Sequence, residues 1–195
     1  MDLKEKITSA LAGHKRLPMA PGPVPAAVLL PLFLKEGKYH ILFTKRTDHL
    51  NHHGGEISFP GGRVHAEDKT LLETALRETW EEIGVRPGDV DVLGTLDDFY
   101  SIHHYVVTPF VGTFPANYSL APNAAEIERI IEVPIDHLLR PDVFRSEDWS
   151  WKGRTTPVYF YKYHDDEIWG LTAAILKQFL DLTFAPSRPS DNSLG

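Results

Sequence analysis

The chain has 195 residues, of which 42% are hydrophobic and 24% are charged, as expected for a globular protein with its own core. The absence of cysteine excludes disulfide bonds, thiolate metal ligands and cysteine nucleophiles. A net charge of −7 argues against a nucleic-acid-binding surface, which is usually basic, but is compatible with a phosphorylated small molecule held through a metal.

Residues 1–23 predict an N-terminal amphipathic helix followed by a proline-rich linker. One face of the helix carries its apolar side chains, which are Leu3, Ile7, Ala10 and Leu11. The segment lacks the apolar core of a signal peptide, and the longest apolar run of the chain, 24–34, is too short and proline-rich to span a bilayer. We therefore expect a cytoplasmic protein that has no membrane partner.

A mixture of strands and helices is predicted for the rest of the chain. A buried strand at 26–34 and a second strand at 39–46 are joined by a turn at 35–38. Further elements are expected as strands at 91–99 and 104–114, a strand and short helix at 126–139, a hairpin at 149–164 and an amphipathic helix at 165–184. Without strict βαβ alternation, this order predicts an α+β fold, an α-β-α sandwich with a mixed β-sheet. We expect one domain over 1–195, with a disordered polar tail at 185–195.

An acidic helix is the most informative element of the sequence. It is predicted to start near 68–70 and to end at Gly84, which suits the left-handed closing position. Core positions on the apolar helix flanks are expected to be Leu72, Leu76, Thr79, Trp80 and Ile83 here, and Trp169 in the final helix. The adjacent flank, which we expect to be exposed, carries Glu78, Glu81 and Glu82.

Three carboxylates spaced i, i+3 and i+4 repel one another unless a cation neutralises them. Mg²⁺ prefers oxygen ligands, and the three carboxylates of this helix converge on one small volume where such an ion would fit. Arg77 and Glu81 form an i, i+4 pair that can brace the array. The preceding Pro-Gly-Gly stretch, 60–62, lets the backbone approach a metal or phosphate closely. The alternative interpretation is an ordinary solvated acidic helix face.

The stretch that contains this helix resembles the signature of the Nudix hydrolase superfamily, G-x5-E-x7-R-E-U-x-E-E-x-G-U, where U is a bulky aliphatic residue. The second half, R-E-x-x-E-E-x-G-V at 77–85, matches at every fixed position. In the first half Asp68 replaces the glutamate, and the spacer to Arg77 is one residue longer. Thr79 stands where the signature has an aliphatic residue.

Residues 42–62 are similar to an additional motif of the coenzyme A diphosphatases in this superfamily, roughly L-L-T-x-R-S-x3-R-x3-G-x3-F-P-G-G. The matching positions are Leu42, Thr44, Arg46, Gly55, Phe59, Pro60, Gly61 and Gly62. Phe43 and Thr47 depart from the motif, and Asn51 replaces a basic residue. Later blocks are also similar, so the resemblance extends from about residue 25 to 180.

The resemblance implies hydrolysis of the diphosphate of coenzyme A or acyl-CoA to 3′,5′-ADP and 4′-phosphopantetheine or its acyl form. It implies Mg²⁺ or Mn²⁺ as cofactor, with ligands from the Gly61 carbonyl, Glu78, Glu81, Glu82 and Glu126. The implied catalytic residues are these four glutamates and Arg77, which would orient them. Glu126 would either bind a metal or activate water, and Asp68 would be structural. The implied substrate-binding residues are Lys45, Arg46, Gly55 and Arg63.

Other functions remain open from the sequence alone. A Nudix enzyme could act on another nucleoside diphosphate, such as ADP-ribose or NADH. A Nudix module could also bind a ligand without turnover, and an acidic scaffold domain is the least specific interpretation. In each enzymatic case the expected partner is a small molecule rather than nucleic acid or membrane, and a homodimer is left open.

Overall fold

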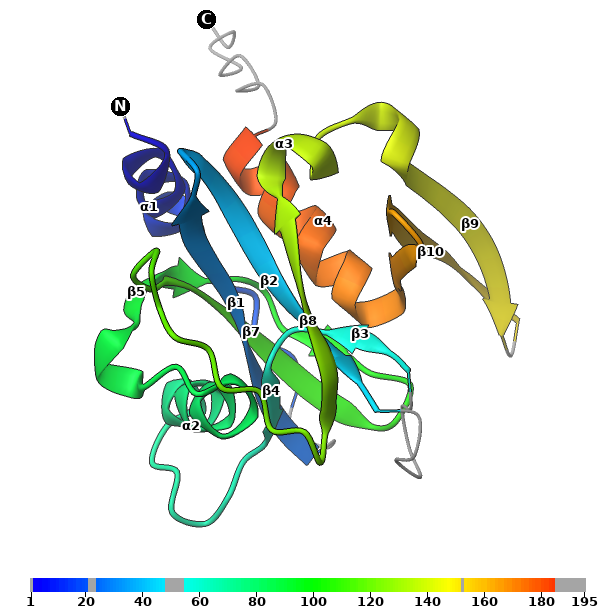
Figure 1. Ribbon diagram of the computed structural model, residues 1–195. Coiled ribbons are helices and arrows are strands. Elements are labelled where there is room, and N and C mark those ends of the chain that lie inside the picture. The colour runs from blue at the N-terminus through cyan, green and yellow to red at the C-terminus, as the bar shows by residue number, and fades with distance from the viewer. Residues whose placement is uncertain (1, 21–23, 48–54, 152, 185–195) are drawn as a thin grey trace, which may run out of the picture.

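The computed structural model describes residues 2–20, 24–47, 55–151 and 153–184 (Figure 1). Asn51 and the predicted tail at 185–195 lie outside the described residues. The helices are α1 (Leu3–Gly13), α2 (Leu71–Ile83), α3 (Ile135–Leu138) and α4 (Gly170–Phe184), with short 3₁₀ turns at Pro87–Asp89 and Pro141–Val143. Among the described residues, no helix is both long enough and apolar enough to cross a bilayer.

Within the described residues, the larger of two sheets has eight strands. They are β1 (Val24–Lys35), β2 (Lys38–Arg46), β3 (Ile57–Ser58), β4 (Gly61–Arg63), β5 (Asp91–Thr95), β6 (Phe99–Tyr100), β7 (Tyr105–Thr113) and β8 (Ile127–Pro134). The main order is β3-β2-β1-β7-β5, with β4 paired to β1, β6 to β7 and β8 to β2. Strands β1 and β7 run parallel and the other pairs run antiparallel, which confirms the predicted mixed sheet. The β1–β2 turn occurs at Glu36 and Gly37, whose φ angles of 52° and 76° suit a tight hairpin.

Helices cover both faces of this sheet, as the alternation of side chains along β1 shows. Leu30 and Leu32 belong to the main core, which includes residues of α1 and α4. Ala27 and Leu29 pack with Ala75 of α2 on the opposite face. Figure 1 shows the same arrangement, with α2 on one side of the sheet and α1 and α4 on the other. The predicted α+β fold with helices flanking a mixed sheet is therefore confirmed.

The N-terminal segment packs against the main core and is hydrogen-bonded to it. Ile7 and Leu11 of α1 are buried in the main core. Beyond the helix, the Arg16 guanidinium donates to both carboxylate oxygens of Asp98, from Nε at 3.0 Å and from Nη2 at 2.9 Å. Asp98 therefore has a structural role in holding this segment.

The prediction of one continuous helix over 165–184 is wrong at its start. A second sheet of three antiparallel strands, β9 (Phe144–Trp151), β10 (Arg154–Tyr163) and β11 (Asp166–Trp169), packs against α4. The ladder between β10 and β11 outweighs the helical pattern, and α4 begins only at Gly170, which has a φ of 64°. Trp169 therefore lies on a strand, 41% exposed and stacked on Phe160, rather than in the core.

Candidate active site

Helix α2 has the ends that its sequence predicts. The Thr70 hydroxyl caps the first turn by accepting the Glu73 N–H at 3.1 Å. Gly84 closes the last turn in the left-handed conformation, with a φ of 78°. The acidic residues are thus held on a helix with both ends defined.

The face that α2 turns toward the sheet differs from the prediction. Its buried residues are Thr74, Ala75, Thr79, Glu82 and Ile83. Trp80 is 55% exposed, so its predicted place in the core is wrong. Small side chains such as Ala75 let the helix approach β1 closely, and this orientation turns Glu82 into the interior. Glu82 is only 3% exposed, although all three acids were expected on an exposed rim.

Arg77 of α2 lies among acidic side chains and hydrogen-bonds to several of them. It donates to the Asp68 carboxylate from Nε at 3.0 Å and from Nη2 at 2.9 Å. Its Nη1 donates to Glu78 Oε1 at 2.8 Å and to Glu81 Oε2 at 3.0 Å. Its Nη2 also donates to the Arg63 carbonyl at 3.1 Å. One guanidinium therefore fixes three carboxylates and the end of β4.

Asp68 is the buried member of this group, with its side chain 5% exposed. The Arg77 guanidinium holds the pKa of Asp68 well below its usual range, although burial opposes this effect. The His65 N–H and the Thr74 hydroxyl, both at 2.9 Å, help to lower it further. Asp68 in turn raises the pKa of Arg77 above its usual value, so this pair is ionised over the whole working pH range.

The glycines after β3 bring the backbone against the acids. A Cβ atom on Gly62 would come within 2.5 Å of the Glu78 carboxylate. A Cβ atom on Gly61 would come within 2.4 Å of the Ala27 carbonyl oxygen in β1. The Gly61 position requires glycine, because a Cβ atom there would collide with fixed backbone of β1. At Gly62 the close group is the end of the Glu78 side chain, so Glu78 lies directly against the β4 backbone.

Glu82 is the buried acid of the candidate site. Its Oε1 lies 3.5 Å from Arg46 Nη1, and its Oε2 has no hydrogen-bond partner within the described part of the chain. Burial raises the pKa of Glu82 to about 8, while the Arg46 charge opposes the rise and the charges of Glu78 and Glu126 add to it. A carboxylate this poorly neutralised would be stabilised by a further cation.

Glu126 reaches the site because its loop is tied to the end of α2. The Asn123 N–H donates to the Glu82 carbonyl at 2.9 Å, and the Thr47 N–H at the end of β2 donates to the Glu126 carbonyl at 2.9 Å. The Glu126 side chain is 44% exposed, with Oε2 at 3.7 Å from Arg46 Nη2. Arg46 therefore lies between Glu82 and Glu126.

Asn123 is a positioning residue that the sequence analysis missed. Its amide donates to Glu126 Oε1 at 3.4 Å, and its Oδ1 accepts the Ala125 N–H at 3.1 Å. The second contact is the local turn that asparagine favours, so a Pro-Asn pair just before Glu126 was the available signal. Its bond to the end of α2 could not be predicted, because Glu82 and Asn123 are 41 residues apart in the sequence.

The other residues predicted to bind substrate are placed less centrally. Lys45 Nζ lies 3.5 Å from Glu128 Oε1 on β8, away from the acids of α2. The Gly55 N–H donates to the Arg46 carbonyl at 3.1 Å, which closes the chain between β2 and β3. Arg63 is exposed beside the Arg77 cluster. The structure thus brings Arg46 to the acids and leaves Lys45 with a different partner.

The donors of this region suit a hard divalent cation. In the described part of the chain, no three acidic or histidine side chains are gathered into a ready-made metal cluster. Two arginines are instead inserted among the acids. The oxygen ligands that Mg²⁺ and Mn²⁺ prefer are nevertheless available, since Glu82 has a buried oxygen without a hydrogen-bond partner among the described residues and Glu78 lies against the backbone of β4.

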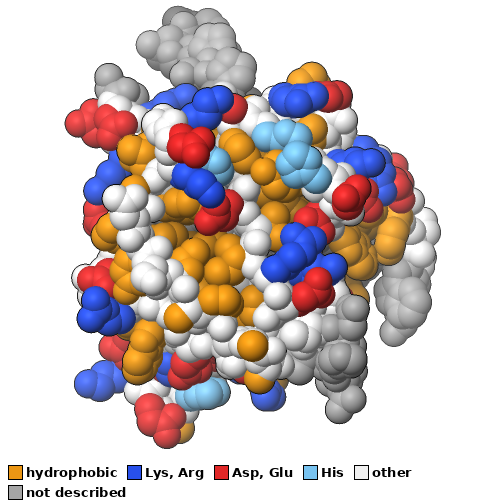
Figure 2. Space-filling model, in the orientation of Figure 1, with side chains coloured by type: hydrophobic (Ala, Val, Ile, Leu, Met, Phe, Trp, Pro, Cys, Tyr) orange, Lys and Arg blue, Asp and Glu red, His pale blue; other side chains and the backbone are white. Residues whose placement is uncertain are grey.

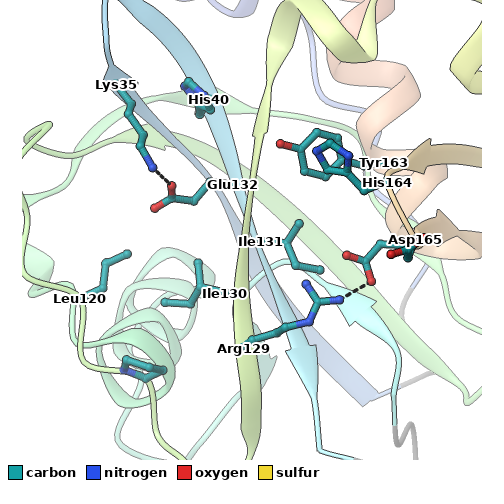
Figure 3. A pocket seen from close by; sticks show the side chains of 12 residues that line it. Lys35, His40, Leu120, Arg129, Ile130, Ile131, Glu132, Tyr163, His164 and Asp165 are labelled. Carbon is teal, nitrogen blue, oxygen red and sulfur yellow. Dashed lines mark hydrogen bonds and ion pairs between the residues drawn. The ribbon is translucent and has the colours of Figure 1, made fainter.

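A hollow of about 770 Å³ lies elsewhere, beside β8 and the turn between β10 and β11 (Figure 3). Four of its charged side chains pair with one another, Lys35 with Glu132 and Arg129 with Asp166. On the face seen in Figure 2, hydrophobic side chains gather in the centre and charged ones lie mostly around them. None of the acids of α2 lines this hollow, so we place the candidate active site at α2 rather than here.

Comparisons with known proteins agree with the fold and the motif. The family model described as "NUDIX domain" matches residues 23–155, more than half of the chain. A protein of Photorhabdus laumondii named "Uncharacterized Nudix hydrolase NudL" is 43% identical over 153 residues, which is 78% of this chain and 81% of that protein. A protein of the same name from Yersinia pestis is 39% identical over 152 residues, 78% of this chain and 76% of that protein.

Two solved structures support the fold alone, because both are distant in sequence. A MutT/nudix family protein from Enterococcus faecalis has a TM-score of 0.51 at 17% identity, covering 87% of this chain and 58% of that one. The Nudix hydrolase RenU from M. smegmatis has a TM-score of 0.50 at 21% identity, covering 63% of this chain and 80% of that one.

Proposed function

The chain belongs to the Nudix hydrolase family, and from that premise we propose that it hydrolyses coenzyme A or acyl-CoA with Mg²⁺ or Mn²⁺. Membership makes it a hydrolase of a diphosphate substrate, whereas coenzyme A is our own choice of substrate. One observation carries that choice. The segment similar to the coenzyme A diphosphatase motif, in its described parts 42–47 and 55–62, contacts the acids at both ends, through Arg46 and through Gly62.

The acids around α2 have the proposed role of metal ligands. Glu78, Glu81 and Glu82, with the Gly61 carbonyl, would hold the cation, and Glu126 would face them from the loop before β8. A bound Mg²⁺ or Mn²⁺ would neutralise charge on the diphosphate and lower the pKa of a bound water. Arg77 keeps Glu78 and Glu81 oriented by its hydrogen bonds at 2.8 and 3.0 Å.

The reaction needs no nucleophilic side chain. Water attacks one phosphorus in line, its oxygen forms the new P–O bond, and the bridging P–O bond breaks so that the other phosphate leaves. The products are 3′,5′-ADP and 4′-phosphopantetheine or its acyl form. Glu126, half-exposed and within reach of the acids, either takes the proton of that water or serves as a ligand.

Arg46, Lys45, Gly55 and Arg63 have the proposed role of substrate binding. Coenzyme A differs from ADP-ribose in its 3′-phosphate and its pantetheine arm. A guanidinium can hold a phosphate through two charge-assisted hydrogen bonds, which makes Arg46 and Arg63 the natural partners of that group.

A substrate panel tests the proposal directly. With Mg²⁺ and with Mn²⁺, kcat/KM is measured for coenzyme A, acyl-CoAs, dephospho-CoA, ADP-ribose and NADH, and the products are identified by mass spectrometry. We expect coenzyme A or an acyl-CoA to give the highest kcat/KM and to yield 3′,5′-ADP. A preference for ADP-ribose or NADH would reject coenzyme A as substrate and leave a diphosphatase of another nucleoside diphosphate.

A further inference from the structure

Arg46 makes unusually loose contacts for a largely buried arginine. Its nitrogens lie 3.5 Å from Glu82 and 3.7 Å from Glu126, beyond the 2.7–3.2 Å range of good N–H···O hydrogen bonds. Its Nε is buried and has no hydrogen-bond partner among the described residues. The side chain is 25% exposed, so water does not fully replace the missing partners.

Glu82, which faces Arg46, also has an unsatisfied atom. Glu82 Oε2 is buried without a hydrogen-bond partner in the described part of the chain. Buried groups of opposite charge normally approach until their hydrogen-bonding capacity is used. Here a donor on Arg46 and an acceptor on Glu82 both stay free, which is the geometry of charge compensation rather than of a fixed ion pair.

We propose that Arg46 is the counter-ion of the metal-free site, and that it leaves Glu82 and Glu126 when the divalent cation binds. The inference rests on the proposed metal site and adds a competition to it. One guanidinium charge at 3.5 Å is replaced by two charges in direct contact with the carboxylates. The released guanidinium is then free to meet a substrate phosphate, which couples metal binding to substrate binding.

The competition has a consequence opposite to that of a positioning role. If Arg46 occupies the site, its removal strengthens metal binding, because the cation no longer displaces a resident charge. If Arg46 positions the carboxylates, as Arg77 does, its removal weakens metal binding. The sign of the change in affinity therefore separates the two roles.

The test is a Mn²⁺ titration without substrate, in which electron paramagnetic resonance reports the free aquo-ion. The variants are Arg46→Met, which keeps the aliphatic stem, and Lys45→Met as the matched control. Lys45 precedes Arg46 on β2 and is equally exposed at 25%, but it pairs with Glu128. We expect Mn²⁺ affinity to rise by about tenfold in Arg46→Met and to change by less than about twofold in Lys45→Met.

The outcomes distinguish failure of the counter-ion role of Arg46 from failure of the metal site. Unchanged or weaker Mn²⁺ binding by Arg46→Met, with binding intact in the wild type, overturns the counter-ion role and leaves the metal site standing. Absence of Mn²⁺ binding in the wild type overturns the metal site and with it the proposed function. If Arg46→Met fails to fold, Arg46→Gln serves as the second uncharged variant, and thermal melts should show a larger Mn²⁺-induced rise in Tm than in the wild type.

Discussion

Two arginines lie among the acids of this site, and they differ in geometry rather than in exposure. Arg77 is 19% exposed and makes hydrogen bonds of 2.8–3.1 Å to Asp68, Glu78 and Glu81 and to a carbonyl. Arg46 is 25% exposed and approaches Glu82 and Glu126 only to 3.5 and 3.7 Å. The Arg77 cluster, formed with Asp68, Glu78 and Glu81, is therefore a permanent brace. The Arg46 cluster, formed with Glu82 and Glu126, keeps hydrogen-bonding and charge capacity that a second cation can use.

Glu82→Gln should have the largest effect, because it removes a buried charge from the Arg46 cluster without changing the side chain's shape. We expect turnover to fall by at least about 100-fold, through lost stabilisation of charge in the transition state. The protein should still fold, and without metal its thermal stability should rise, since the cost of burying an ionised carboxylate beside Glu78 and Glu126 is removed. Steady-state kinetics and thermal melts in EDTA check both expectations.

Glu81→Gln is the matched control in the Arg77 cluster. The Glu81 side chain is 50% exposed, against 15% for that of Glu78 and 5% for that of Glu82, so water already screens its charge, and Arg77 binds it at 3.0 Å. The fold reduction in turnover should be at least about ten times smaller in Glu81→Gln than in Glu82→Gln. Equal losses in the two variants would show that the two clusters do not differ in the way described.

Arg77→Met should lower the free energy of unfolding, because it removes the brace that Arg77 provides. Its loss leaves the Asp68 carboxylate, 5% exposed, without its charged partner, and breaking a buried pair in this way costs about 3 to 5 kcal/mol. Urea unfolding in EDTA measures the loss. Arg86→Met, which removes a 73% exposed arginine paired with Asp89, should be indistinguishable from the wild type. A similar result for Arg77→Met would show that Arg77 does not stabilise the fold by bracing Asp68.

The two clusters should respond to pH with opposite signs. The folded-state pKa of Glu82 is raised from 4.5 to about 8, so the folded protein binds more protons than the unfolded chain between these values. Stability without metal should therefore fall as pH rises from about 5 to 8, by an amount on the order of a few kcal/mol. The decline should be absent from Glu82→Gln in urea unfolding with EDTA.

Asp68 supplies the opposite case. Its folded-state pKa is depressed, so its contribution is fully present above the unfolded value of 3.8 and is lost as pH falls below it. In Asp68→Asn the wild type's loss of stability below pH 4 should be smaller, while the decline between pH 5 and 8 should persist. An unchanged acid limb in this variant would contradict the assignment to Asp68.

Arg46→Met should have the smallest effect on catalysis when Mn²⁺ is saturating. Under that condition its competition with the metal is masked, and only its proposed contact with a substrate phosphate remains. We expect KM for coenzyme A to rise by roughly tenfold and KM for dephospho-CoA to rise less, because that substrate lacks the 3′-phosphate. Equal increases for both substrates would place Arg46 at the diphosphate instead.

Local signals were sufficient to predict the elements that carry the site. Thr70 and Gly84 define the ends of α2, and a left-handed pair at Glu36 and Gly37 closes the predicted hairpin. The start of α4 could not be obtained in this way. The stretch before Gly170 fits a helical pattern, and only its pairing with β10 makes it a strand.

For the site itself, burial and long-range contacts limited what could be predicted from the sequence. The apolar pattern of α2 favoured Trp80 for the core. In the structure the small residues of α2 face the sheet instead, and Glu82 is buried as a consequence. The approach of Arg46 to Glu126 depends on a loop tied to α2 through Asn123, which no periodicity encodes. The residue types of the site were readable from the sequence, whereas their neutralisation by two different arginines was not.

We propose that the divalent cation binds at Glu82, beside Arg46, and also contacts Glu78, which Arg77 holds at 2.8 Å. Anomalous diffraction from crystals soaked in Mn²⁺ tests it most directly, because the ion is located independently of activity. We expect an anomalous peak in contact with the carboxylates of Glu82 and Glu78, with the Arg46 guanidinium moved away from Glu82. A peak confined to the Arg77 cluster around Asp68, or no peak at Glu82, would contradict it.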